Sequence, residues 1–135
     1  MRTKRKAIDQ WLNRQVTTLE HKFGDIKDSA IYFADYDHYE EGKRITLVPG
    51  CDIIISSRVP AVSFMIRCYM LAGIILPLHH HPDYYEEFYI ISGHITDLET
   101  GDVYGPGDHV IFHEMIRHHI SCTADAEISI KCVKV

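Results

Sequence analysis

The sequence has no apolar run of the roughly 18 residues that a membrane-spanning helix requires. It also lacks the pattern of a secretory signal. The basic start MRTKRKAIDQWLNRQ continues with Asp9, Gln10 and Asn13, where such a signal needs an apolar segment. We therefore expect a protein without a membrane segment that stays in the cytoplasm.

Paired cysteines are also lacking. The four cysteines, Cys51, Cys68, Cys122 and Cys132, stand singly and form no C-x-x-C motif. This pattern argues against a disulfide framework and against a thiolate-rich structural zinc site. Because three of them lie within apolar, strand-like runs, we expect reduced and buried thiols.

An excess of positive charge is lacking as well: the formal net charge is −5, which makes a general nucleic-acid-binding function improbable. Basic residues are nevertheless concentrated near the start, where residues 1–22 contain six Lys or Arg against Asp9 and Glu20. This basic segment could bind an acidic partner, or it could be the solvated face of a helix.

The residue pattern changes along the chain. Apolar residues at three-to-four-residue spacing, including Ile8, Trp11, Leu19 and Phe23, predict an amphipathic α-helix over residues 1–24. Residues 25–44 are acidic and rich in tyrosine, and we interpret them as a connecting segment. From residue 45 to 135, short apolar runs are separated by Pro and Gly with no helix between them, which predicts one all-β domain, a sandwich or barrel.

A histidine run lies within this all-β region, in the stretch GIILPLHHHPDYYEEFYIISG (residues 73–93). Alternate residues of a strand face the same side, so His79 and His81 point together and His80 points away. A carboxylate on the returning strand can meet both imidazoles, and His118 offers a further ligand from a later strand. Because buried polar groups without partners are costly, this convergence favours a bound cation.

The same stretch contains a longer motif. The spacing G-x5-H-x-H-x4-E-x6-G is met by Gly73, His79, His81, Glu86 and Gly93. It resembles the first motif of the cupin superfamily, whose members are small β-barrels of the jelly-roll type (RmlC-like, a double-stranded β-helix). The spacing selects Glu86 over its neighbour in the EE pair.

The second cupin motif, G-x5-P-x-G-x2-H-x3-N, is similar to residues 107–122 only in part. Gly107 and His118 match, whereas His113, Met115 and Cys122 replace the proline, glycine and asparagine. The resemblance covers roughly residues 45–133. It implies a single metal centre with the ligands His79, His81, Glu86 and His118.

Three imidazoles and one carboxylate suit Fe, Mn, Ni, Co or Zn, and leave two octahedral positions for other ligands. We therefore expect a metal-binding protein acting on a small carboxylate or carbonyl metabolite, as a dioxygenase or as a Lewis-acid isomerase or lyase. Tyr84 is the candidate catalytic acid or base. Arg67, Tyr69 and Cys122 are candidate substrate-binding residues.

An alternative is a non-catalytic module that senses a metabolite or assists another protein, because fold does not determine function. For either function we expect a homodimer, because cupins commonly pair through sheet edges and pairing covers strand edges that would otherwise aggregate.

Overall fold

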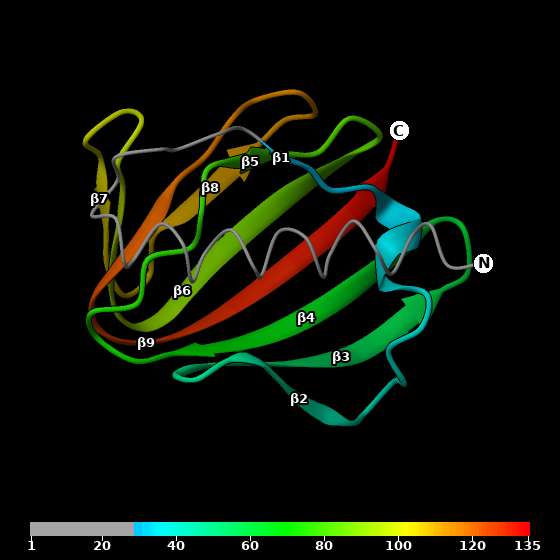
Figure 1. Cartoon of the computed structure of the whole chain (residues 1–135), viewed down its shortest axis with the longest axis horizontal. Coiled ribbons are helices and arrows are strands. Elements are labelled where there is room, and N and C mark those ends of the chain that lie inside the picture. The colour runs from blue at the N-terminus through cyan, green and yellow to red at the C-terminus, as the bar shows by residue number, and fades with distance from the viewer. Residues whose placement is uncertain (1–28) are drawn as a thin grey trace.

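The computed structural model describes residues 29–135. The predicted helix over residues 1–24, and residues 25–28 of the predicted connection, lie outside the described residues. The described part is all-β except for one short 3-10 helix, η1 (Phe33–Tyr36), as the sequence predicts (Figure 1). No helix in this part is long and apolar enough to cross a membrane.

Most strands form one large antiparallel sheet with the order β2-β3-β4-β9-β6-β7, to which β8 adds by pairing with β6. A second, two-stranded sheet pairs β1 with β5 in parallel. The strands are β1 (Ser29–Ala30), β2 (Arg44–Val48), β3 (Cys51–Val59), β4 (Ser63–Met70), β5 (His79–His80), β6 (Tyr84–Asp97), β7 (Val103–Tyr104), β8 (His109–Phe112) and β9 (Ile120–Lys134).

The core consists of side chains that alternate along the strands with more exposed ones. In β4, Phe64, Ile66, Cys68 and Met70 are buried, whereas the residues between them are half-exposed. Each buried aliphatic or aromatic side chain contributes about 1.5–3 kcal/mol relative to an exposed one. One face of the curled sheet therefore encloses the apolar interior, and the other face meets solvent.

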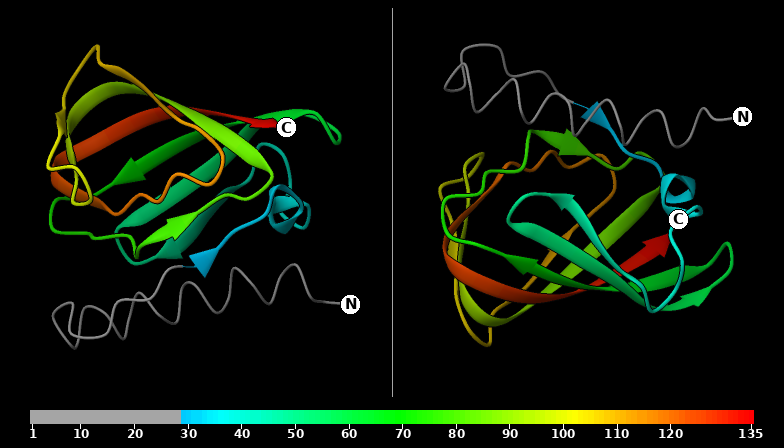
Figure 2. Two further views of the ribbon diagram at one scale, coloured as in Figure 1. Left: turned by 90° about the horizontal axis from the view of Figure 1, so that it is seen from above. Right: turned by 60° about the horizontal axis from the view of Figure 1, so that its bottom comes forward.

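The sheet closes into a barrel because residues 73–79 pair with residues 118–122. Backbone hydrogen bonds run in both directions between His79 and His118, and others join Leu76 to Ile120 and Ile74 to Cys122. Figure 2 shows the resulting barrel from two sides, with the long strands curling around a common interior. The prediction of an all-β jelly-roll barrel is thus confirmed.

Two strands are longer than the sequence suggests. Gly93 and residues 123–125 look like breaks in the sequence, yet β6 and β9 continue through them. The register of this pair shifts three times between Ile90 and Ile95, so bulges absorb the bend. Gly93 permits this because its φ is +79° and a Cβ there would lie 2.0 Å from the carbonyl oxygen of Asp125.

The described part of the tyrosine-rich segment before residue 45 also packs into the barrel. Ile31, Phe33 and Tyr36 are buried in the core cluster. The backbone amide of Ile31 donates to the carbonyl of His80, and that of Phe33 donates to the carboxylate of Asp83. This segment therefore lies directly beside the strand that carries the histidine run.

Candidate metal centre

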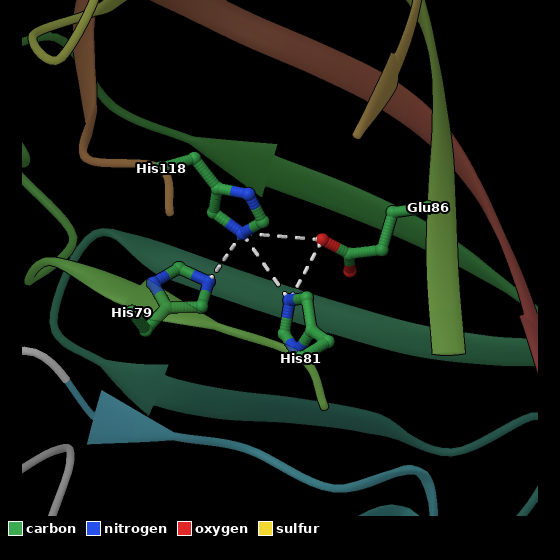
Figure 3. A group of neighbouring side chains, drawn as sticks. All are labelled: His79, His81, Glu86 and His118. Carbon is green, nitrogen blue, oxygen red and sulfur yellow. Dashed lines mark hydrogen bonds and ion pairs between the residues drawn. The ribbon is translucent and has the colours of Figure 1, made fainter. Parts of the chain in front are cut away.

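Four side chains from separate parts of the chain meet inside the barrel. The potential ligand atoms of His79, His81, Glu86 and His118 all lie within 4.8 Å of one another, and all four residues are buried. Figure 3 shows the three imidazoles and the carboxylate pointing toward one common centre. The structure therefore brings together the four residues that the resemblance implies as ligands.

Strand parity and pairing explain this convergence. His79 begins β5 and His81 follows it, so both face the interior, whereas His80 between them is only half-buried. Glu86 occupies an inward position of β6, and His118 is held opposite His79 by their two backbone hydrogen bonds. Glu87 faces outward and lies 3.6 Å from the ring of His109 in an ion pair.

Backbone carbonyls orient two of the imidazoles. The Nδ1 of His79 lies 2.8 Å from the carbonyl oxygen of Pro77, and the Nδ1 of His81 lies 3.0 Å from that of Ile31. A carbonyl only accepts hydrogen bonds, so both Nδ1 atoms carry the proton and both Nε2 atoms present a lone pair to the centre. Metal-binding histidines are commonly oriented in this way.

The resulting arrangement is electrostatically unfavourable without a cation. The Nε2 of His118 lies 2.8 Å from that of His79 and 3.2 Å from that of His81. The Nε2 of His81, which has no proton, lies 2.9 Å from the Oε1 of the Glu86 carboxylate, so two hydrogen-bond acceptors face each other. One divalent ion would bind both of these lone pairs and that of His79.

The distances also match such an ion. Two neighbouring octahedral ligands, each about 2.1 Å from a metal, lie about 3.0 Å apart. The Oε1 of Glu86 lies 2.9 Å from the Nε2 of His81 and 3.4 Å from that of His118, and the two Nε2 distances given above are similar. The residues present therefore fit a single metal ion.

The charge states fit as well. Burial alone would raise the pKa of Glu86, but its neighbours His81 and His79 outweigh burial and lower that pKa. Burial lowers the pKa of His118 well below its ordinary value, and the neighbouring imidazoles of His79 and His81 add to this. Glu86 is thus a carboxylate and His118 a neutral imidazole at neutral pH, which are the forms that bind metals.

Two neighbours of the site are not indicated by sequence spacing. The thiol of Cys132 lies 3.7 Å from the Oε2 of Glu86, so Oε1 remains free to face the histidines. Tyr36 lies in η1, and its hydroxyl is 3.3 Å from that of Tyr84. Strand alternation could have placed Cys132 inside the barrel, but no pattern marks Tyr36.

Tyr84, the predicted acid or base, is fully buried, and its hydroxyl lies 3.5 Å from the Nε2 of His81. Burial raises the pKa of Tyr84 well above its ordinary value, and the charges of Tyr36 and Glu86 add to this. It therefore stays protonated, and its hydroxyl donates to that of Tyr36 beside the centre.

The three predicted substrate-binding residues lie elsewhere. Arg67 and Tyr69 occupy the outer face of β4, where Arg67 forms an ion pair with Glu127 and the Tyr69 ring packs under the guanidinium of Arg44. Cys122 is buried, but its thiol is directed to the carbonyls of Met70 and Ala124. The strand parity that brings His79 and His81 together thus keeps Arg67 and Tyr69 out.

A cavity of about 60 Å³ adjoins the cluster. Its walls include His79, Glu86 and His118, together with Tyr36 and many apolar side chains. All four cysteines are free and buried, as predicted, and two of them, Cys51 and Cys68, line this cavity.

The turn before His118 contains a backbone conformation that favours glycine. Met115, at the position of the motif glycine, has a φ of +67°, a left-handed conformation that glycine adopts more easily. Its backbone amide donates to the carbonyl of His81, which ties this turn to the ligand-bearing segment.

Comparisons with known proteins agree with this architecture. No protein-family profile matches the sequence, and no curated protein is significantly similar to it. Among solved structures, KdgF from Halomonas sp. superposes with a TM-score of 0.61 at 15% identity, over 68% of this chain and 86% of that chain.

Two other solved structures have similar TM-scores. A predicted oxalate decarboxylase from Thermotoga maritima has a TM-score of 0.58 at 19% identity, over 69% of this chain and 91% of that chain. An acetylacetone dioxygenase from Acinetobacter johnsonii has a TM-score of 0.56 at 12% identity, over 62% and 59%. With its jelly-roll barrel, its buried His/Glu cluster and these structural relatives, the protein has the cupin fold.

Proposed function

We propose that the protein binds one divalent metal ion through the Nε2 atoms of His79, His81 and His118 and a carboxylate oxygen of Glu86. The observation that carries the proposal is the orientation of the imidazoles. Two Nδ1 atoms face backbone carbonyls, so the Nε2 lone pairs of His79 and His81 point to the centre, at 2.8 and 3.2 Å from the Nε2 of His118, and that of His81 lies 2.9 Å from the Glu86 carboxylate. Fe, Mn, Ni, Co and Zn suit this ligand set.

We propose further that the centre acts on a small carboxylate or carbonyl metabolite. When bound, the ion supplies Lewis-acid activation of a carbonyl or carboxylate oxygen or, if it is redox-active, the electrons for dioxygen chemistry. The protein's own part is to hold the ligands, exclude bulk water and keep the hydroxyl of Tyr84, which donates to that of Tyr36, 3.5 Å from the Nε2 of His81. The names of the similar dioxygenase and decarboxylase support these reaction classes.

A second candidate is a non-catalytic metabolite sensor. Its support is that a similar fold occurs in a chain of the complex between SigE and the anti-sigma protein ChrR of Rhodobacter sphaeroides, at 22% identity and a TM-score of 0.57. Shared fold alone does not distinguish an enzyme from a sensor, so the site must be assayed.

One experiment separates these functions. Metal content is measured on protein purified from its own host, and the loaded protein is then tested for oxygen uptake and for product formation from small carboxylates and diketones. Turnover supports the enzyme. Thermal stabilisation by one metabolite without turnover supports the sensor. Failure to retain any divalent ion near one equivalent contradicts both.

The assembly and compartment that the sequence predicts are part of this proposal. We propose a cytoplasmic homodimer that pairs through a sheet edge. The support is that β2 is a terminal strand of the large sheet, and its Arg44 and Thr46 are exposed. Sedimentation of the purified protein tests this arrangement, and a monomer at micromolar concentration contradicts it.

A further inference from the structure

The cavity beside the candidate metal centre has an unusual charge pattern. Besides the metal-ligand residues, its walls consist of aliphatic and aromatic side chains, the phenol of Tyr36 and the thiols of Cys51 and Cys68. No Lys or Arg is among the described residues that line it. Arg67, which the sequence suggested as a substrate-binding cation, is on the outer face of the sheet in its ion pair with Glu127.

This pattern limits the charge of a ligand. A divalent ion with three neutral imidazoles and the Glu86 carboxylate has a net charge of +1. A monoanion brings the site to neutrality, whereas a dianion leaves one uncompensated negative charge among apolar walls. Burying an unpaired charge is strongly unfavourable, and the neutral phenol and thiols can only donate hydrogen bonds to it.

The cavity also limits the size of a ligand. Its volume of about 60 Å³ is far below the several hundred Å³ of ordinary metabolite pockets. Its walls include strand residues such as Ile66 and Ile130, which are buried at inward positions of β4 and β9. A ligand must therefore be compact.

We infer that the site selects small monoanionic ligands with a short apolar end, such as a short 2-oxo monocarboxylate, and discriminates against dicarboxylates of the same size. This inference rests on the proposed metal function and specifies its substrate class. It separates this protein from an oxalate-binding role, although a predicted oxalate decarboxylase shares its fold.

Three ligands with the same number of non-hydrogen atoms test the charge argument: butane-2,3-dione (neutral), pyruvate (monoanion) and oxalate (dianion). Protein is loaded with Co(II), its metal content is measured, and each ligand is titrated while the visible Co(II) spectrum is recorded. We expect pyruvate to bind at least tenfold more tightly than oxalate. Loss of the ion to oxalate counts as absence of a complex at the site. Phenylglyoxylate, a monoanion with a phenyl group in place of the methyl, should not bind.

A charge change at the site provides a second test. Glu86→Gln retains an oxygen ligand but raises the net charge of the loaded centre to +2, so the preference for pyruvate over oxalate should fall at least tenfold. Glu87→Gln is the matched control, because Glu87 faces outward toward His109. It should leave the preference unchanged.

The outcomes separate the two proposals. If the protein retains no metal, both the metal function and the ligand inference are overturned. If wild-type protein retains metal but binds oxalate as tightly as pyruvate, the ligand inference alone is overturned, and this result does not depend on whether either variant folds. Binding of phenylglyoxylate would likewise overturn the size limit.

Discussion

Replacement of His81 tests the candidate metal centre most directly. His81 is 2% exposed, its Nδ1 donates to the carbonyl of Ile31, and its Nε2 lies 2.9 Å from the Oε1 of Glu86. His81→Ala therefore removes one of four proposed ligands. His80→Ala makes the same chemical change one residue away, on the opposite side of the strand.

The expected effect follows from known ligand energetics. Changing only a hydrogen-bond partner of a metal-binding histidine typically costs about 10–100-fold in metal affinity. Loss of the ligand itself should therefore cost more than about 100-fold, which corresponds to about 2.7 kcal/mol. His80→Ala should change the affinity by less than about threefold.

Thermal unfolding with and without metal measures this difference. At a metal concentration 100 times the wild-type Kd, binding stabilises wild-type protein by about 2.7 kcal/mol, but it stabilises a variant with a 100-fold weaker site by only about 0.4 kcal/mol. For a domain of this size, these values correspond to shifts in Tm of about 10 °C and about 1–2 °C. Comparing each variant with and without metal removes any general loss of stability.

Equal loss of the metal-dependent shift in His80→Ala and His81→Ala would contradict the assignment of His81 as a metal ligand. It also fails if His81→Ala keeps the full shift, because the imidazole would then contribute nothing to the site. Isothermal titration of the same metal into each folded variant provides an independent affinity.

Three further predictions concern residues around the site. Cys132→Ala should weaken metal binding about tenfold, because the Oε2 of Glu86 loses its nearby thiol. Cys132→Ser should keep the metal affinity within about threefold of the wild-type value. Equal losses of affinity in the two variants, measured by metal titration, would contradict the role of this contact. Gly93→Ala should lower the free energy of unfolding in urea by more than about 3 kcal/mol, because its Cβ would meet the carbonyl of Asp125, whereas Gly101→Ala, with a similar φ but open space, should cost about 1 kcal/mol. Arg67→Ala should change that free energy by less than about 1 kcal/mol and leave pyruvate binding unchanged, because its ion pair with Glu127 is partly exposed; loss of pyruvate binding would return Arg67 to the site.

Local pattern determined much of this protein. Short apolar runs without intervening helices identified the all-β domain, because alternation within a strand is a local property. The same two-residue period separated His79 and His81 from His80, and motif spacing selected Glu86 over Glu87. His118 could be chosen because its glycine-to-histidine spacing is retained, although three other motif positions have changed.

Long-range contacts decided the rest. The sequence suggested breaks at residue 93 and at residues 123–125, but pairing of β6 with β9 carries both strands through them by bulges. Tyr36 and the carbonyl of Ile31 reach the centre from a segment interpreted as a connection, and no local spacing marks them.

The tertiary structure also decided on which face of the sheet Arg67 lies. Alternation identifies the two faces of β4, but only closure of the barrel shows which face encloses the metal-ligand cluster. The sequence by itself determined the strands, their periodicity and the four converging side chains. The folded barrel decided the neighbours of those side chains, because hydrogen bonds and packing between distant strands leave no periodic mark along the chain.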